Sequence, residues 1–196
     1  MQRHGSKRRE QCSGPGPTSV PTVSNVIIRK ATAEDWAGIY PFFSAIVATG
    51  TMSPTLRAFR WRRLGRSGWS SLRAAPVVAA EGDTILGSAK MGPNRASRGS
   101  HVATASSMVD PPQAGRGVGR ALGEHVLVWA RSAGYRSMQF NAVVETNTGA
   151  VHLWQSFGFQ ILTTIAEAFD HHEHGLVGLH IIFQTLTERE DADNAL

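Results

Sequence analysis

The sequence has little of what would cross-link a chain or anchor it in a membrane. Cys12 is the only cysteine among 196 residues, so neither an intrachain disulfide nor a cysteine-based metal cage can form. Such sparing use of cysteine is typical of a reducing compartment, and we therefore expect a cytoplasmic protein. No stretch approaches the ~18 consecutive apolar residues of a membrane span, and we expect no membrane partner.

Charge is also sparse, at 18% of residues, and the net charge of +5 is concentrated near the N-terminus. Residues 1–24 hold four of the twenty basic residues and one of the fifteen acidic ones, which leaves +2 for the rest of the chain. The segment is otherwise rich in Ser, Gly, Pro and Thr. This composition predicts a disordered basic tail over residues 1–25, a folded domain over residues 26–187 and a C-terminal tail over residues 188–196.

A second basic segment alternates arginines with aromatic residues. It contains Arg57, Arg60, Arg62, Arg63, Arg66, Phe59, Trp61 and Trp69. It is either an anion or nucleic-acid patch, or a solvated helix face whose arginine stems pack on the aromatic rings. We favour the second interpretation, because a nucleic-acid-binding domain usually carries a more one-sided charge. Nucleic acid is therefore not our expected partner.

The hydrophobic pattern predicts an alternation of strands and helices in one α/β (α+β) domain. Strands are expected at residues 26–29, 76–80, 84–91, 101–109, 137–145, 159–166 and 176–186. Helices are expected at residues 33–48 behind a Thr32 cap, at 54–65, at 118–133 before a Gly134 cap, and from Thr146 to Gly158. In the strand at 137–145, alternation predicts Met138, Phe140, Ala142 and Val144 on one face, and Gln139, Asn141, Val143 and Glu145 on the other.

The most informative motif spans residues 107–122. A strand breaks at two prolines, passes through Gly115, Gly117 and Gly119, and enters an amphipathic helix. Backbone N–H groups at such a helix start can bind a pyrophosphate, although tight packing alone would also explain the glycines. The dinucleotide-binding pattern is excluded because Leu122 stands at its third glycine, and no Gly-Lys-Ser/Thr triphosphate loop occurs.

Three linked segments resemble the GNAT superfamily of acetyl-CoA-dependent N-acetyltransferases. They are Met108-Val109 with Gly115-Arg-Gly-Val-Gly119, Asn147 at the next helix start, and Leu153-Trp-Gln-Ser-Phe-Gly-Phe159. The resemblance implies a mixed, mostly antiparallel sheet of six to seven strands flanked by about four helices. It also implies transfer of an acetyl group from acetyl-CoA to an amine and, because members are often dimers, a homodimer.

The resemblance further implies how the chain would hold acetyl-CoA. The strand ending at Val109 would be splayed from its neighbour, so that backbone groups of Ser107, Met108 and Val109 could hydrogen-bond the pantetheine arm. Residues implied at the pyrophosphate are Gln113, Gly115, Arg116, Gly117, Val118, Gly119 and Arg120, of which Arg116 or Arg120 would meet a phosphate oxygen. Asn147 would support the far end of the arm.

Within the superfamily, Ser100-His-Val102 and Phe140-Asn-Ala-Val-Val-Glu-Thr-Asn147 resemble acetyltransferases for proline analogues such as azetidine-2-carboxylate. The resemblance implies that Asn141 orients the substrate, that Thr104 occupies the position of a second Asn, and that Glu145 could receive the amine proton. Asn141 could instead bond neighbouring backbone, and Glu145 could be a salt-bridged or exposed carboxylate.

Two departures from the family pattern concern the chemistry. Ala114 stands where the family usually has Arg or Gln, and Trp154 where many members have the tyrosine that protonates the thiolate. An indole N–H is a donor only and is not a useful acid. Cys12 lies far from the motif in the sequence, so we expect direct attack in a ternary complex rather than an acetyl-cysteine.

Residues 170–174, Asp-His-His-Glu-His, could hold a metal, and the resemblance implies that His171 or His172 could be a base or a substrate contact beside the acceptor pocket. Adjacent residues converge poorly on one ion, so we expect a hydrated loop and no metal cofactor. Our prediction is an N-acetyltransferase for a small-molecule amine, with an amino acid or analogue favoured. The alternatives are a non-catalytic acetyl-CoA-binding module and a nucleic-acid-associated protein that uses the Arg57 to Arg66 segment.

Overall fold

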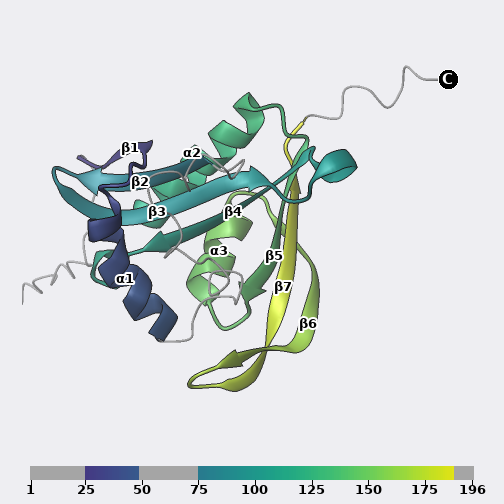
Figure 1. The fold of residues 1–196 in the computed structure, drawn as a ribbon. Coiled ribbons are helices and arrows are strands. Elements are labelled where there is room, and N and C mark those ends of the chain that lie inside the picture. Colours follow the sequence, from purple (N-terminus) through teal and green to yellow (C-terminus); the bar gives the residue numbers. More distant parts are fainter. Residues whose placement is uncertain (1–24, 49–74, 188–196) are drawn as a thin grey trace, which may run out of the picture.

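The computed structural model describes residues 25–48 and 75–187, which form one seven-stranded sheet with helices on both faces (Figure 1). The strands are β1 (Ile27–Lys30), β2 (Ala75–Glu81), β3 (Thr84–Pro93), β4 (Val102–Val109), β5 (Ser137–Val144), β6 (Gln160–His171) and β7 (Gly175–Thr185). The α-helices in these ranges are α1 (Trp36–Ala48), α2 (Val118–Ser132) and α3 (Thr148–Ser156). The spatial order is β1-β2-β3-β4-β5-β7-β6, and every neighbouring pair is antiparallel except β4 with β5.

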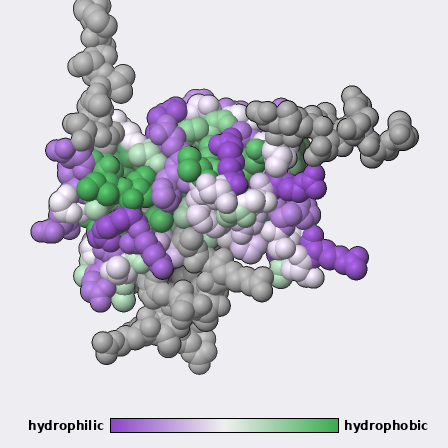
Figure 2. Space-filling model, turned by 90° about the horizontal axis from the view of Figure 1, so that it is seen from above, coloured by the Kyte–Doolittle hydropathy of each residue, from purple (hydrophilic) through white to green (hydrophobic). Residues whose placement is uncertain are grey.

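The mixed, mostly antiparallel sheet confirms the expected fold class. The predicted helix at residues 54–65, the arginine-rich segment, Cys12 and the two tails lie outside the described residues. No helix in the described ranges is long and apolar enough to cross a membrane. Viewed from above, the surface mixes hydrophilic residues with separate hydrophobic areas (Figure 2).

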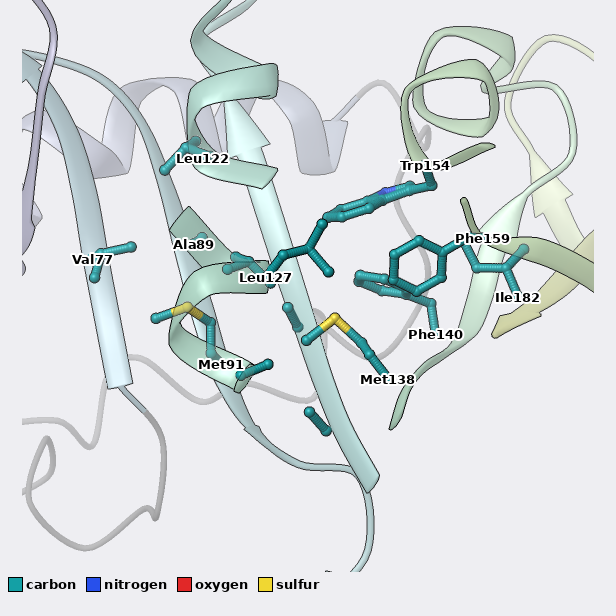
Figure 3. Close-up of a cluster of buried hydrophobic side chains, with 14 of the residues drawn as sticks. Val77, Ala89, Met91, Leu122, Leu127, Met138, Phe140, Trp154, Phe159 and Ile182 are labelled. Atoms are coloured by element: carbon teal, nitrogen blue, oxygen red, sulfur yellow. The ribbon is translucent and has the colours of Figure 1, made fainter. Parts of the chain in front are cut away.

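The two faces of the sheet carry separate hydrophobic clusters. On the face that we call the α1 face, Ile39 and Phe42 pack against Val78 and Met108. On the opposite α2–α3 face, Leu122 and Val126 of α2 and Trp154 of α3 join the main cluster of sheet residues (Figure 3). Residues that are partners across neighbouring strands point to the same face, so strand register assigns further side chains to each side.

Helix α1 begins at Trp36, three residues later than predicted, and Thr32 is not its cap. Asp35 accepts hydrogen bonds from the Thr32 N–H at 2.7 Å and from the Arg29 guanidinium at 2.6 and 2.7 Å. The backbone carbonyl of Asp35 accepts the N–H groups of Gly38 and Ile39. These contacts hold residues 33–35 in a turn and make Asp35 the residue from which the helix starts.

Strands β4 and β5 pair only where they begin. Val102 is the partner of Ser137 and Ala103 that of Met138, and no further register pair joins the two strands. From Thr104 onward β4 stays paired with β3 alone. The sheet therefore has a wedge-shaped split between two adjacent parallel strands, as the family resemblance predicted.

A bulge in β5 makes the predicted face assignment wrong. Phe140 is the partner of Ile182, and Val143 is the partner of His180. The chain therefore advances by three residues on β5 where it advances by two on β7. Beyond the bulge the alternation reverses, because one extra residue shifts every later side chain to the other face. Val143 packs with Met138 and Phe140 on the α2–α3 face, whereas Ala142 and Val144 pack in a cluster on the α1 face.

The expected hydrated loop at residues 170–174 is shorter than predicted, because residues 172–174 form an exposed turn whereas Asp170 and His171 belong to β6. Strand β6 continues to His171, five residues past its predicted end, and bulges near Glu167, which has φ of 53°. His171 is only 6% exposed, and its Nδ1 accepts the N–H groups of Glu173 and His174. Among the described residues, no group of three or more His, Cys, Asp or Glu side chains could hold a metal ion.

Candidate functional site

A cavity of about 470 Å³ occupies the split between β4 and β5. Residues 105–109 of β4 form one wall and residues 142–144 of β5 the other. Its lining comes from both faces of the sheet, with Ile46 on the α1 face and Val118, Leu153 and Trp154 on the opposite face. The cavity therefore passes through the layer of the sheet.

Strand β4 offers an unpaired backbone edge to this cavity. Its hydrogen-bond partners from Thr104 to Val109 lie on β3, so alternate N–H and C=O groups on the other side point into the split. The predicted pantetheine contacts, Ser107, Met108 and Val109, all line the cavity. A ligand arm that bears amides could hydrogen-bond this edge as a further strand would.

The glycine-rich turn follows the end of β4 and lies at the wide end of the split. Gly115 and Gly117 have φ of 77° and 83°, a left-handed conformation that strains any residue with a Cβ. The first backbone hydrogen bond of α2 joins the Ala121 N–H to the Gly117 C=O. The N–H groups of residues 118–120 thus have no acceptor within the helix, and such groups at the positive end of a helix suit an anion.

Gln113, Gly115, Val118 and Gly119 line the cavity, whereas Arg116, Gly117 and Arg120 do not. The Arg116 guanidinium donates to Gln113 Oε1 and to Glu81 Oε2, the latter at 2.9 Å. Gln113 and Glu81 therefore fix the position and the orientation of the Arg116 guanidinium beside the turn. Ala114 lines the cavity as well, so the departure from the family pattern removes a side chain and leaves the backbone in place.

Arg120 is directed away from the cavity, toward the end of α3. It donates to Ser156 Oγ at 3.0 Å, and its guanidinium carbon lies 5.2 Å from the centroid of the Phe157 ring. These contacts join α2 to α3 through a hydrogen bond and a cation–π interaction. Of the two arginines, Arg116 is the better placed for a phosphate beside the glycine turn.

Asn147 is the N-cap of α3, a position that the pattern had assigned to Thr146. Its Oδ1 accepts the Ala150 N–H at 3.1 Å, and both residues line the cavity. The cap uses only the oxygen of the amide, so the NH₂ group can donate to a carbonyl of a bound ligand.

Trp154 forms part of the cavity wall. It is 5% exposed, and its ring centroid lies 4.4 Å from that of Phe140 and 5.3 Å from that of Phe159 (Figure 3). The indole thus fills the space between α3 and the sheet. Its size and contacts explain it as a packing residue, with no acid function required.

Asn141 and Thr104 lie on the α1 face near the closed end of the split. Asn141 Nδ2 donates to Asn94 Oδ1 at 2.6 Å, and its Oδ1 accepts from Gln139 Nε2 at 2.7 Å. Thr104 is the partner of Gly92 on β3, two residues before Asn94. The three amides form a polar network on this face, although neither Asn141 nor Thr104 lines the cavity itself.

Glu145 does not share that face, contrary to the predicted alternation. Its Oε1 accepts the Gly178 N–H at 2.5 Å, and its Oε2 would lie 2.6 Å from a Cβ built on Gly178. Val177 and Leu179 pack on the α1 face, so a Cβ on Gly178, which lies between them on β7, would point to the α2–α3 face. Glu145 therefore fastens the end of β5 to β7, on the far side of the sheet from Asn141.

Sequence reasoning missed several wall residues, among them Ile46, Ser106, Phe140, Val143 and Leu153. Most are apolar side chains whose pattern indicates only a buried core. They come from α1, β4, β5 and α3, so no local signal marks them, and their role follows only from the split in the sheet.

Comparison with known proteins agrees with this geometry. The acetyltransferase (GNAT) family model matches residues 36–159. A GCN5-related N-acetyltransferase structure from Kribbella flavida has a TM-score of 0.72 and 45% identity, covering 82% of this chain and 98% of that one. A phosphinothricin acetyltransferase from Sinorhizobium meliloti, solved in complex with acetyl-CoA, has a TM-score of 0.67 and 20% identity, covering 84% and 90% of the two chains.

Among curated proteins, the N-acetyltransferase aca1 from Schizosaccharomyces pombe is 32% identical over 111 residues. The match covers 56% of this chain and 53% of aca1, so the chain spans about half the length of that relative.

Proposed function

The chain belongs to the acetyltransferase (GNAT) family, whose members use acetyl-CoA, and we propose that it acetylates the amine of a small molecule. An amino acid or a close analogue is the favoured acceptor. The amine nitrogen bonds to the thioester carbonyl carbon, the C–S bond breaks, CoA leaves as its thiolate, and the amine proton passes to a base or to water. No acetylated enzyme intermediate is required.

The observation that carries the proposal is the split between β4 and β5 with the glycine turn at its wide end. The unpaired edge of β4 suits the amide-bearing pantetheine arm, and the N–H groups at the start of α2 suit the pyrophosphate. Arg116 would add a charge-assisted hydrogen bond to a phosphate oxygen. Asn147 would donate its NH₂ group to a carbonyl of the arm.

The acceptor would approach from the α1 face, where Thr104 and the Asn94–Gln139–Asn141 network supply polar groups close to the narrow end of the split. Asn141 would orient the substrate through an amide that Asn94 and Gln139 already fix. The role of Glu145 as proton acceptor stays a prediction, and its position on the opposite face supports a bridge through water rather than direct contact. The boundaries at residues 26 and 187, the cytoplasmic location and a homodimer also stay predictions.

The test is thiol release from acetyl-CoA across free amino acids, proline analogues, polyamines, aminoglycosides and peptide N-termini. We expect selective release with amino acids or their analogues, and mass spectrometry should find one acetyl group on the amine. Selective release with peptide N-termini alone would contradict a small-molecule acceptor. Binding of acetyl-CoA without release by any amine would instead favour the non-catalytic module.

A further inference from the structure

Lys90 is a lysine in the interior of the sheet, on β3, where few lysines occur. Its register partners are Pro76 on β2 and Ser106 on β4. Two residues earlier, Ser88 is the partner of Met108, which packs in the α1-face cluster. Alternation therefore places the Lys90 side chain on the α1 face as well.

Apolar Pro76 lies beside Lys90 on β2, whereas on β4 the neighbours on the way to the split are small and polar. Ser106 is directly beside it and lines the cavity, and Ser88 is only 8% exposed. Thr104 lies on the other side of Ser106 along β4. The long lysine stem can therefore reach over Ser106 toward the split, between Thr104 and Met108 of β4.

The Lys90 side chain is partly buried, so its charged ammonium group loses part of its contact with water. Burial lowers the pKa of the Lys90 ammonium below its usual value. The side chain already has an interaction in the free protein, and an anionic ligand would add to this contact or replace it. A partly desolvated cation beside a ligand cavity is suited to pair with a buried anion.

We propose that Lys90 is a specificity-determining residue that binds the carboxylate of the acceptor, so that the enzyme prefers amines that carry a carboxylate. The inference rests on the proposed acetyl transfer and names its acceptor class. The Lys90 ammonium would hold the carboxylate above Ser106, while the amine of the same molecule points into the split. Ser106 lines the cavity at this point and Thr104 lies next to it on β4, so a small zwitterion would find polar partners beside Lys90.

The test compares an amino acid with its own amide, such as proline with prolinamide, as acceptors. The ratio of kcat/KM for acid to amide is measured for the wild type and for Lys90→Met, which keeps the stem and removes the charge. Differences in amine basicity between the two acceptors cancel in the comparison of ratios. Lys90→Arg keeps the charge, and Lys30→Met on the exposed edge strand β1 is the matched control.

We expect Lys90→Met to lower the ratio of acid to amide by about tenfold to a hundredfold, as for a hydrogen bond to a charged group. Lys90→Arg should retain part of the preference and Lys30→Met all of it. An equal fall for acid and amide, or an unchanged ratio, would overturn the proposal, since a merely structural role affects both acceptors alike.

A second measurement uses only the wild type and does not need turnover. Calorimetry compares binding of an N-acetylated amino acid and its amide to the complex with CoA, and we expect tighter binding of the acid. Equal binding overturns the role of Lys90. If amines are acetylated but acids are not preferred, the Lys90 inference fails while the acetyltransferase proposal stands. If no amine is acetylated, the proposed function fails.

Discussion

Replacing Gly119 by alanine should separate the stability of the protein from its affinity for acetyl-CoA. A Cβ built on Gly119 lies 3.6 Å from Leu153 Cδ2 and 3.6 Å from Val109 Cγ2, which is ordinary van der Waals contact. The folded protein can therefore accept the methyl group without strain. Both neighbours line the cavity, so the added methyl group would stand between its walls, where the ligand must pass.

The two effects have opposite signs. Alanine is a better helix former than glycine by up to about 1 kcal/mol, which corresponds to an increase in Tm of about 2–4 °C for a domain of this size. The same methyl group would push the pyrophosphate away from the N–H groups of residues 118–120. Losing one hydrogen bond to a charged group costs about 1.5–3 kcal/mol, which is roughly a tenfold to hundredfold weaker Kd.

The assay is thermal unfolding of the ligand-free protein together with calorimetric titration of acetyl-CoA. Val128→Ala is the matched control, because Val128 is a 61% exposed residue of the same helix and is not part of the cavity lining. It should raise Tm slightly and leave the Kd unchanged. If Gly119→Ala binds acetyl-CoA as tightly as the wild type, the assignment of the anion site to the start of α2 is wrong.

Three further predictions concern packing and charge. Gly123→Ala should destabilise the protein by about 1–3 kcal/mol in denaturant titrations, because its Cβ would lie 2.5 Å from Phe157 Cε2; an unchanged midpoint would contradict the observed contact between α2 and α3. Trp154→Phe should lower the free energy of unfolding but leave the shape of the pH–rate profile unchanged, since the indole is not an acid. If the variant lost the fall in rate at high pH, Trp154 would have to act as the acid after all. The guanidinium of Arg29 holds the pKa of the Asp35 carboxyl below its usual value, so the stabilisation is present above about pH 4 and is lost as the pH falls through the lowered folded-state pKa. Asp35→Asn should therefore unfold at a lower temperature than the wild type near neutral pH, and the two melting curves should converge toward pH 2; a constant difference would exclude the ion pair as the cause.

The glycine turn shows what could be predicted from the sequence. Glycines at alternate positions before an amphipathic helix have few physical uses, and their positive φ values and the open helix start follow from local rules alone. The same holds for the ends of α2 and α3, where Gly134 and Gly158 have positive φ as expected. Each of these features depends on neighbours within a few residues.

Strand β5 shows what could not be predicted. Its alternation placed Asn141 and Glu145 together, yet the bulge between Phe140 and Val143 puts them on opposite faces. Nothing in the local sequence marks the extra residue, because a bulge depends on the register with β7, a strand more than thirty residues away. Lys90 was missed for a related reason, since its position beside the cavity depends on its pairing with Ser106.

The open split also makes the sheet a partition with access from two sides. The starts of α2 and α3, which we propose bind the cofactor, lie on one side, whereas the polar network and Lys90 lie on the other. We therefore expect substitutions on the α1 side to change the preference for the acceptor and to leave the affinity for acetyl-CoA unchanged. In the proposed arrangement the two substrates would enter from opposite sides of the sheet, and a new acceptor specificity would need new residues on one side only.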